Sequence, residues 1–221
     1  MRRVLVLRPE PGASETVRRA VEQGLDAVAV PLFEIEAVAW HAPDAAGFDA
    51  LLLTSANSVR EGGGGLQGLR GLPAYAVGDA TASAAREAGF DIKASGDSGV
   101  DRLLGSIEPE LRLLHLCGED QKTPQPPRQD VTAVVVYRAK PVDSPDLRDA
   151  HGSIALVHSP RAARRFAQLV EDRGTIALAA ISAAAAEQAG DGWEAVEVAD
   201  SPRDEALLAL AARLCNKPAG E

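Results

Sequence analysis

The chain has 221 residues, a formal net charge of −9, and a composition of 46% hydrophobic, 4% aromatic and 25% charged residues. This length accommodates one large domain or two small ones, whose cores must consist mainly of Ala, Val and Leu. The acidic charge excludes nonspecific binding to nucleic acids or to a membrane surface, because both require a basic face. It is compatible with a small anionic ligand, since a local site can oppose the global charge.

The sequence carries no targeting or metal-binding pattern. The first apolar run ends at Arg8, which is too short for a secretion signal, and no run approaches the roughly 18 residues of a membrane span. Cys117 and Cys215 are isolated thiols. The histidines lie far apart, at His41, His115, His151 and His158. We therefore expect a cytoplasmic protein with reduced cysteines and without a metal site.

The elements predicted along the chain alternate between strands and helices. Apolar runs at 4–7 and 27–30 flank a helical pattern and predict a first β-α-β unit. Residues 32–38 then alternate apolar and polar side chains, which is typical of an exposed crossing strand. Further strands are predicted at 50–53, 75–77, 92–94, 113–116, 131–137, 155–157, 176–181 and 196–199. The glycine run 62–65 predicts a flexible loop.

An internal repeat divides the chain. Residues 51–55 resemble residues 155–159, so that Thr54 corresponds to His158, 104 positions later, and Gly78 corresponds to Ser182 at the same shift. A repeat of this length indicates duplicated domains rather than a solenoid. We predict an α/β fold of two similar parallel-sheet, flavodoxin-like lobes joined by a two-stranded ribbon hinge.

The repeat also predicts the domain boundaries. One lobe is discontinuous and comprises residues 1–34 and 142–221, and the other comprises residues 40–135. The crossing strands 35–39 and 136–141 lie side by side as the hinge. We expect the working site in a cleft between the lobes, where strands end and helices begin.

The candidate ligand-binding residues follow the predicted strands, because parallel α/β sheets bind ligands at the carboxyl ends of their strands. They are Arg8, Thr54, Ser55, Gly78, Thr81, Gly96, Gly118, His158, Ser159 and Ser182. Helix N-termini offer free N–H groups and can hold anions without lysine. For any single hydroxyl residue, capping of a helix is an alternative explanation. Taken alone, His158 is better explained as a solvated turn residue.

Tyr137 ends a long apolar strand and opens the second crossing segment. We expect its phenol to point into the space between the lobes as a hydrogen-bond donor or proton source. The alternative is an aromatic ring packed against the hinge.

The order of several short motifs resembles that of the uroporphyrinogen-III synthase family over nearly the whole chain. The motifs are Leu5-Val6-Leu7-Arg8-Pro9, Pro31-Leu32-Phe33-Glu34-Ile35, Thr54-Ser55-Ala56-Asn57-Ser58-Val59-Arg60, Ala76-Val77-Gly78-Asp79-Ala80-Thr81, Leu114-His115-Leu116-Cys117-Gly118-Glu119-Asp120, Val136-Tyr137-Arg138-Ala139 and His158-Ser159-Pro160-Arg161-Ala162-Ala163. The sequence departs from the family pattern at Cys117, where arginine is frequent, and at Ser182 and Ala185, where the family often has Gly-x-x-Thr.

The resemblance implies a cofactor-independent, cyclising hydro-lyase. Such an enzyme closes the linear tetrapyrrole polycarboxylate hydroxymethylbilane, inverts the last pyrrole ring and gives uroporphyrinogen III, the precursor of haem, sirohaem and corrins. It further implies that Tyr137 assists departure of the hydroxyl group and that Thr81 lines the cleft. We expect a monomer that makes at most a transient contact with the upstream deaminase. Two alternatives stay open, namely a non-catalytic two-lobe small-molecule binding protein and a flavodoxin-like nucleotide binder.

Overall fold

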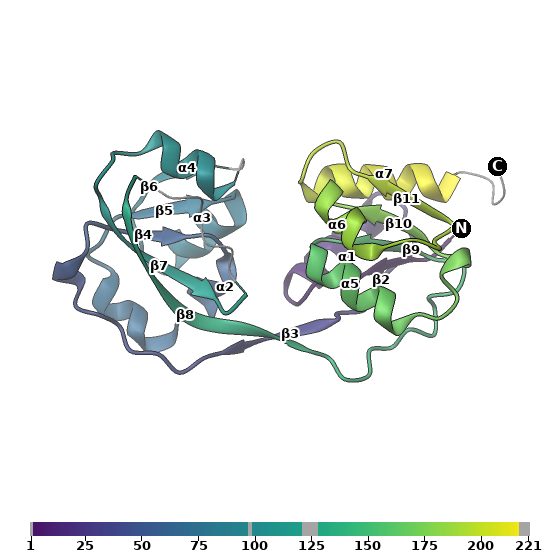
Figure 1. Cartoon of the computed structure of the whole chain (residues 1–221), viewed down its shortest axis with the longest axis horizontal. Coiled ribbons are helices and arrows are strands. Elements are labelled where there is room, and N and C mark those ends of the chain that lie inside the picture. The colour runs from purple at the N-terminus through teal and green to yellow at the C-terminus, as the bar shows by residue number, and fades with distance from the viewer. Residues whose placement is uncertain (1, 97–98, 121–127, 217–221) are drawn as a thin grey trace. The chain divides into compact units, whose positions relative to one another are not determined.

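The computed structural model describes residues 2–96, 99–120 and 128–216. The chain forms two compact units, each with its own largely parallel sheet and helices (Figure 1). Unit 1 comprises Met1–Glu34 and Pro141–Glu221, and unit 2 comprises Ile35–Lys140. The predicted α/β class with two largely parallel sheets is therefore confirmed. The predicted cleft between the lobes stays a prediction.

Unit 1 contains a five-stranded parallel sheet in the order β11-β10-β9-β1-β2. The strands are β1 (Val4–Val6), β2 (Ala27–Ala29), β9 (Ile154–Val157), β10 (Ala177–Ala180) and β11 (Ala195–Val198). The helices are α1 (Gly12–Glu22), α5 (Pro160–Leu169), η3 (Arg173–Thr175), α6 (Ala183–Ala189) and α7 (Asp204–Asn216). In chain order the strands read 2-1-3-4-5, which is the flavodoxin-like order.

The three inner strands of unit 1 are apolar throughout because helices cover both faces of the sheet. Every residue of β1, β9 and β10 is buried. On one face, Val4 and Val6 pack in a cluster with Leu207 and Leu210 of α7. The continuous apolar runs of the sequence therefore form the centre of the sheet. β11 is half-exposed and forms one of its edges.

Unit 2 contains a six-stranded sheet in the order β3-β8-β7-β4-β5-β6. The strands are β3 (Phe33–Ala37), β4 (Ala50–Leu53), β5 (Ala74–Val77), β6 (Ile92–Gly96), β7 (Arg112–Gly118) and β8 (Asp130–Pro141). The helices are η1 (Ala45–Gly47), α2 (Ala56–Arg60), η2 (Gly63–Leu69), α3 (Asp79–Glu87) and α4 (Val100–Ser106). Alternate residues of β4 feed two separate core clusters, because Leu51 and Leu53 enter one cluster and Ala50 and Leu52 enter the other.

The two sheets have the same spatial arrangement of strands, but the chain enters that arrangement at a different strand in each unit. The order β6-β5-β4-β7-β8 in unit 2 matches β11-β10-β9-β1-β2 in unit 1. The repeat partners Thr54 and His158 directly follow the corresponding strands β4 and β9. The repeat found in the sequence therefore reflects equivalent positions in two sheets.

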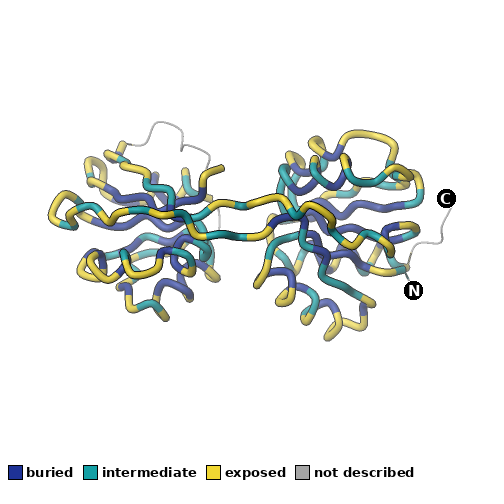
Figure 2. The backbone as a smooth tube through the Cα atoms, turned by 90° about the horizontal axis from the view of Figure 1, so that it is seen from below, coloured by how far each residue is buried: buried dark blue, intermediate teal, exposed yellow. Residues whose placement is uncertain are grey.

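The segments that link the units are strand β3 and the second half of strand β8. β8 runs unbroken from Asp130 to Pro141 and includes the predicted crossing residues 136–141 as its second half. β3 lies next to β8, and the Val38 N–H donates to the Val136 carbonyl at 2.9 Å. Most residues of β3 and β8 are half-buried or exposed, in contrast to the buried inner strands (Figure 2). Because these strands are only partly buried, polar side chains can alternate with apolar ones along them.

The glycine run is ordered, which corrects the prediction of a flexible loop. It opens the 3₁₀ helix η2, and the Trp40 indole N–H donates to the Gly62 carbonyl at 3.0 Å. A Cβ on Gly65 would lie 2.6 Å from Trp40 Cζ2. The missing side chain lets the indole ring lie directly on the backbone, and this contact explains the glycine better than flexibility does.

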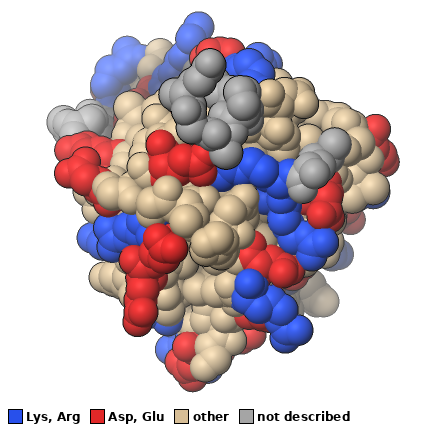
Figure 3. All heavy atoms as spheres, turned by 90° about the vertical axis from the view of Figure 1, so that its right-hand side faces the viewer, with Lys and Arg blue, Asp and Glu red and all other residues tan. Residues whose placement is uncertain are grey.

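Charges are mixed on the one face of the protein that Figure 3 displays, where acidic and basic side chains lie among one another. At the amino end of β1, Arg2 pairs with Glu194, and Arg3 pairs with Asp26 and Asp149. Within the described part of the chain, no helix is long and apolar enough to cross a membrane. Within the same part, no group of three His, Cys, Asp or Glu residues could hold a metal ion.

Candidate functional site

Each sheet has one point where the order of its strands reverses, and such points bind ligands in open α/β folds. In unit 1 this point lies between β1 and β9, and Arg8 and His158 follow these strands. In unit 2 it lies between β4 and β7, where Thr54 and Gly118 stand at the strand ends. The candidate residues therefore fall into two groups, one at the carboxyl edge of each sheet.

Asp204 is the centre of the group in unit 1. Its carboxylate accepts hydrogen bonds from His158 Nε2 at 2.8 Å and from the Thr16 hydroxyl at 3.0 Å. Arg19 pairs with the other oxygen at 2.8 Å, and Arg8 Nη1 lies 3.6 Å from the first. Asp204 opens α7, Thr16 and Arg19 lie on α1, and the remaining two residues follow strands. One carboxylate thus ties two helices to two strand ends.

The charges of this group follow from its burial. The side chains of His158 and Asp204 are 8% and 11% exposed. Burial lowers the pKa of His158 and outweighs the bond to Asp204, so the imidazole is neutral and donates from Nε2. Burial raises the pKa of Asp204, but His158, Arg19 and Thr16 outweigh it and the net pKa is lowered. His158 is therefore a buried hydrogen-bonded residue, and the interpretation as a solvated turn residue is wrong.

Arg8 lies across Gly12, the first residue of α1. A Cβ on Gly12 would lie 2.6 Å from Arg8 Nε, so only glycine leaves room for this guanidinium. Arg8 Nη1 also donates to the Thr16 hydroxyl at 3.4 Å, and the Arg8 side chain is 34% exposed. Arg8 is thus partly held by its neighbours and partly accessible to a ligand.

In unit 2 the hydroxyl of Thr54 is joined to a buried histidine. Thr54 Oγ1 lies 2.9 Å from His115 Nε2, and His115 is 2% exposed. Burial lowers the pKa of His115 to about 4, so its imidazole is neutral near pH 7. Since Thr54 and His158 are repeat partners, both units fix the residue after the central strand with one buried polar partner.

Tyr137 owes its orientation to a β-bulge. The pairing of β7 with β8 shifts between Cys117 and Gly118, and the Glu119 N–H donates to the Tyr137 carbonyl at 3.0 Å. Bulges turn a side chain to another face. Tyr137 packs against the same core cluster as Val136, its chain neighbour, although neighbours in a regular strand face opposite ways. Its ring lies against Gly118 and is half-buried.

The remaining candidates lie at helix N-termini, apart from Gly96, which ends β6. Ser55, Ser159 and Ser182 are the N-caps of α2, α5 and α6, and each side chain accepts a backbone hydrogen bond. The capping explanation therefore accounts for all three. Gly78 caps α3 with φ of 84°, its N–H donates to the Gly96 carbonyl at 2.8 Å, and Thr81 is buried one turn later.

Sequence reasoning missed the residues that support the candidates. Asp204, Thr16, Arg19 and His115 contact them but do not follow a strand. The sequence carried one usable signal for Asp204, because this residue opens a helix after Pro202 and acidic residues are typical of a first helical turn.

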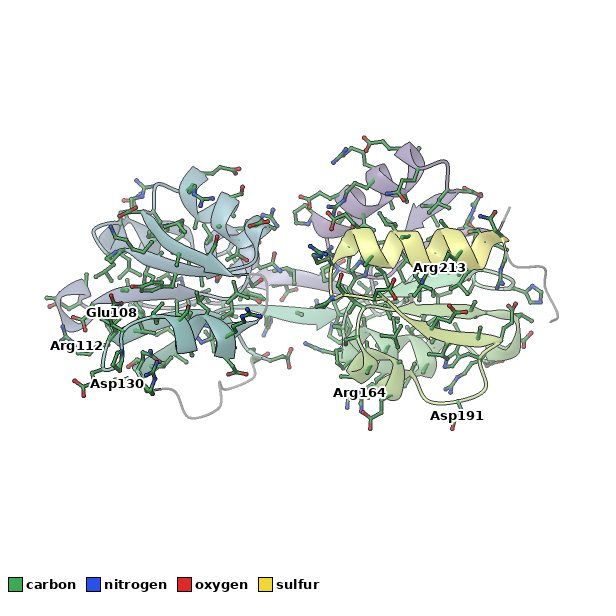
Figure 4. All side chains as sticks on the ribbon, turned by 90° about the horizontal axis from the view of Figure 1, so that it is seen from above. Glu108, Arg112, Asp130, Arg164, Asp191 and Arg213 are labelled. Carbon is green, nitrogen blue, oxygen red and sulfur yellow. The ribbon has the colours of Figure 1, made fainter. Side chains whose placement is uncertain are left out.

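Other charged residues lie at the opposite, amino edge of the sheet in unit 2, where Figure 4 shows Glu108, Arg112 and Asp130 near one another.

Comparison with known protein families assigns the chain to one family. A family model described as uroporphyrinogen-III synthase HemD matches residues 14–209, which covers most of both units. The chain belongs to the uroporphyrinogen-III synthase family. The resemblance predicted from the sequence is therefore confirmed.

Three individual proteins described as members of this family are similar to the chain. A uroporphyrinogen-III synthase from Chlorobaculum parvum is 43% identical over 61 residues, which is 27% of this chain and 25% of the relative's length. The crystal structure of uroporphyrinogen-III synthetase from Helicobacter pylori matches with a TM-score of 0.65 and 20% identity, over 97% of this chain and 100% of that one. A uroporphyrinogen III synthase from Thermus thermophilus matches with a TM-score of 0.53 and 17% identity, over 99% and 100%. These structures share the fold of this chain.

Proposed function

We propose that this protein is a uroporphyrinogen-III synthase that cyclises hydroxymethylbilane with inversion of the terminal pyrrole ring, as a lyase of tetrapyrrole biosynthesis. The observation that carries the proposal is the family match over residues 14–209, which includes strand ends from both sheets. We further propose that it works in the cytoplasm as a monomer, without cofactor or metal, and meets the upstream deaminase only transiently.

The proposed reaction removes one water and closes the ring. Tyr137 Oη donates its proton to the departing terminal hydroxyl, which leaves as water and gives a protonated, electrophilic azafulvene beside the Tyr137 phenolate. The substituted carbon of the last pyrrole ring attacks the azafulvene and forms a spiro intermediate. This intermediate fragments and recloses with the ring inverted, and the proton lost from the closing ring returns to Tyr137.

The protein contributes mainly positioning and fixed dipoles. Arg8 and the helix N-termini capped by Ser55, Ser159 and Ser182 offer donors to the carboxylates of the substrate. Thr54, Gly78, Thr81, Gly96, Gly118 and His158 complete the proposed substrate-binding set. Neutral His158 and neutral His115 add no charge to the two edges.

The products of one assay test the proposal. The protein is mixed with hydroxymethylbilane made enzymatically, and the uroporphyrinogen isomers are oxidised and separated. A synthase gives isomer III, whereas a non-catalytic binding protein leaves only isomer I from spontaneous closure. Formation of isomer I alone overturns the proposed function.

A further inference from the structure

Asp204 contacts candidate residues without being accessible itself. Its side chain is 11% exposed, and four side chains surround its two oxygens. A buried carboxylate of this kind is costly unless its neighbours compensate it, so its presence calls for a structural or functional reason. We propose that Asp204 is a positioning residue that fixes the Arg8 guanidinium for binding one carboxylate of the linear tetrapyrrole. This inference rests on the proposed function.

Hydrogen bonds connect Arg8 to Asp204 through the Thr16 hydroxyl. The Thr16 hydroxyl donates its single proton to Asp204 and accepts from Arg8 Nη1 at 3.4 Å. His158, as a neutral imidazole, donates to Asp204 from Nε2. Loss of the Asp204 charge would free the Thr16 hydroxyl to rotate and would remove the ion pair at 3.6 Å. Arg8 would then lose two of the neighbours that fix its orientation.

Partial exposure suits Arg8 to a second carboxylate, because 34% of its side chain is accessible. Arg19 takes the close ion pair with Asp204 at 2.8 Å, whereas Arg8 stands 3.6 Å away, outside hydrogen-bonding distance. A guanidinium carries five donors in one plane and binds carboxylates through two parallel hydrogen bonds. Because Gly12 has no side chain, the guanidinium can lie close to the backbone of α1. Its position beside the strand-order reversal of unit 1 is where α/β sheets bind ligands.

The competing explanation is that Asp204 only joins α7 to α1 and β9. In that case its removal would lower stability and leave substrate affinity unchanged. Glu205 provides the matched control, because it is the next residue of the same helix terminus and its side chain is 71% exposed. Asp204→Asn and Glu205→Gln each remove one negative charge at the start of α7, so both change the helix terminus and the net charge equally.

The experiment measures KM, kcat and the thermal midpoint of the full chain with enzymatically made hydroxymethylbilane. Asp204→Asn is expected to raise KM about tenfold with kcat changed less than about twofold, which corresponds to about 1.4 kcal/mol of lost binding. Glu205→Gln is expected to leave both constants unchanged. On an Arg8→Gln background, Asp204→Asn is expected to raise KM no further, because the residue it positions is absent.

Two results overturn the inference while the proposed function stands. One is an active wild-type enzyme whose Asp204→Asn variant has the normal KM and only a lower thermal midpoint. The other is the same increase in KM with and without Arg8. If Asp204→Asn does not fold, Thr16→Val decides, since it removes only the bridging hydroxyl and should raise KM about threefold, but only when Arg8 is present. A wild-type protein that forms no isomer III overturns both proposals.

Discussion

The Tyr137 ring lies so close to the backbone of Gly118 that a Cβ at Gly118 would approach Tyr137 Cζ to 2.6 Å and Oη to 2.9 Å. The two residues are also paired across β7 and β8 just after the bulge. The observed placement of the Tyr137 ring therefore requires glycine at residue 118. The pair supplies the most direct tests of the mechanism.

Gly118→Ala should displace the Tyr137 ring and lower kcat about tenfold, while the circular dichroism spectrum stays unchanged. The displacement is expected because a phenol ring can shift more readily than the two strands can. Gly105→Ala is the matched control, since no atom lies within 4 Å of a Cβ at Gly105 in the same unit. A Gly118→Ala enzyme with the wild-type rate would show that the exact ring position does not matter.

Tyr137→Phe should lower kcat roughly 10-fold to 100-fold without unfolding the protein, because it removes the proposed proton donor and keeps the ring. Tyr75 is the other tyrosine of the chain, and its hydroxyl contacts Glu108 at 3.4 Å. Tyr75→Phe should therefore leave the rate of isomer III formation unchanged. Equal rates for all three proteins would remove Tyr137 from the mechanism.

His115 should make unit 2 less stable in acid. Its folded pKa of about 4 lies below its ordinary value of 6.5, so the unfolded chain binds the proton more readily. Stability from this residue is complete above pH 6.5 and is lost as the pH falls toward 4. Urea unfolding should show a loss of about 2 kcal/mol between pH 7.5 and pH 5 from this group.

The control for His115 separates this loss from that of other groups. His115→Asn should reduce the pH dependence by the stated amount, whereas His151→Asn should not, since His151 is exposed. Identical pH dependence in the wild type and His115→Asn would contradict a buried neutral imidazole.

Cys117 should be unreactive in the folded protein. Burial raises the pKa of its thiol to about 11, and its exposure is 1%. Iodoacetamide at pH 8 should therefore label Cys215, which is less buried, before Cys117. Peptide masses after timed labelling measure the order, and urea should make both thiols react. Prompt labelling of Cys117 without denaturant would contradict its burial.

The sequence by itself determined the α/β class, the repeat and the strand ends that carry the candidate residues. These features are local, because apolar runs and the turn residues after them depend on near neighbours in the chain. Thr54 and His158 could be paired as equivalents since a duplicated unit keeps its local pattern. The family resemblance could be found for the same reason.

Only the tertiary structure decided what those residues contact. The Asp204 group joins residues from the two ends of the chain, and no spacing in the sequence encodes that meeting. The bulge that turns Tyr137 onto Gly118 depends on the pairing of two strands, and the Trp40 contact turns a glycine run from an expected loop into an ordered helix. Burial lowers the pKa of both His158 and His115; at His158 removal from water outweighs the hydrogen bond to Asp204, and at His115 burial is the sole cause.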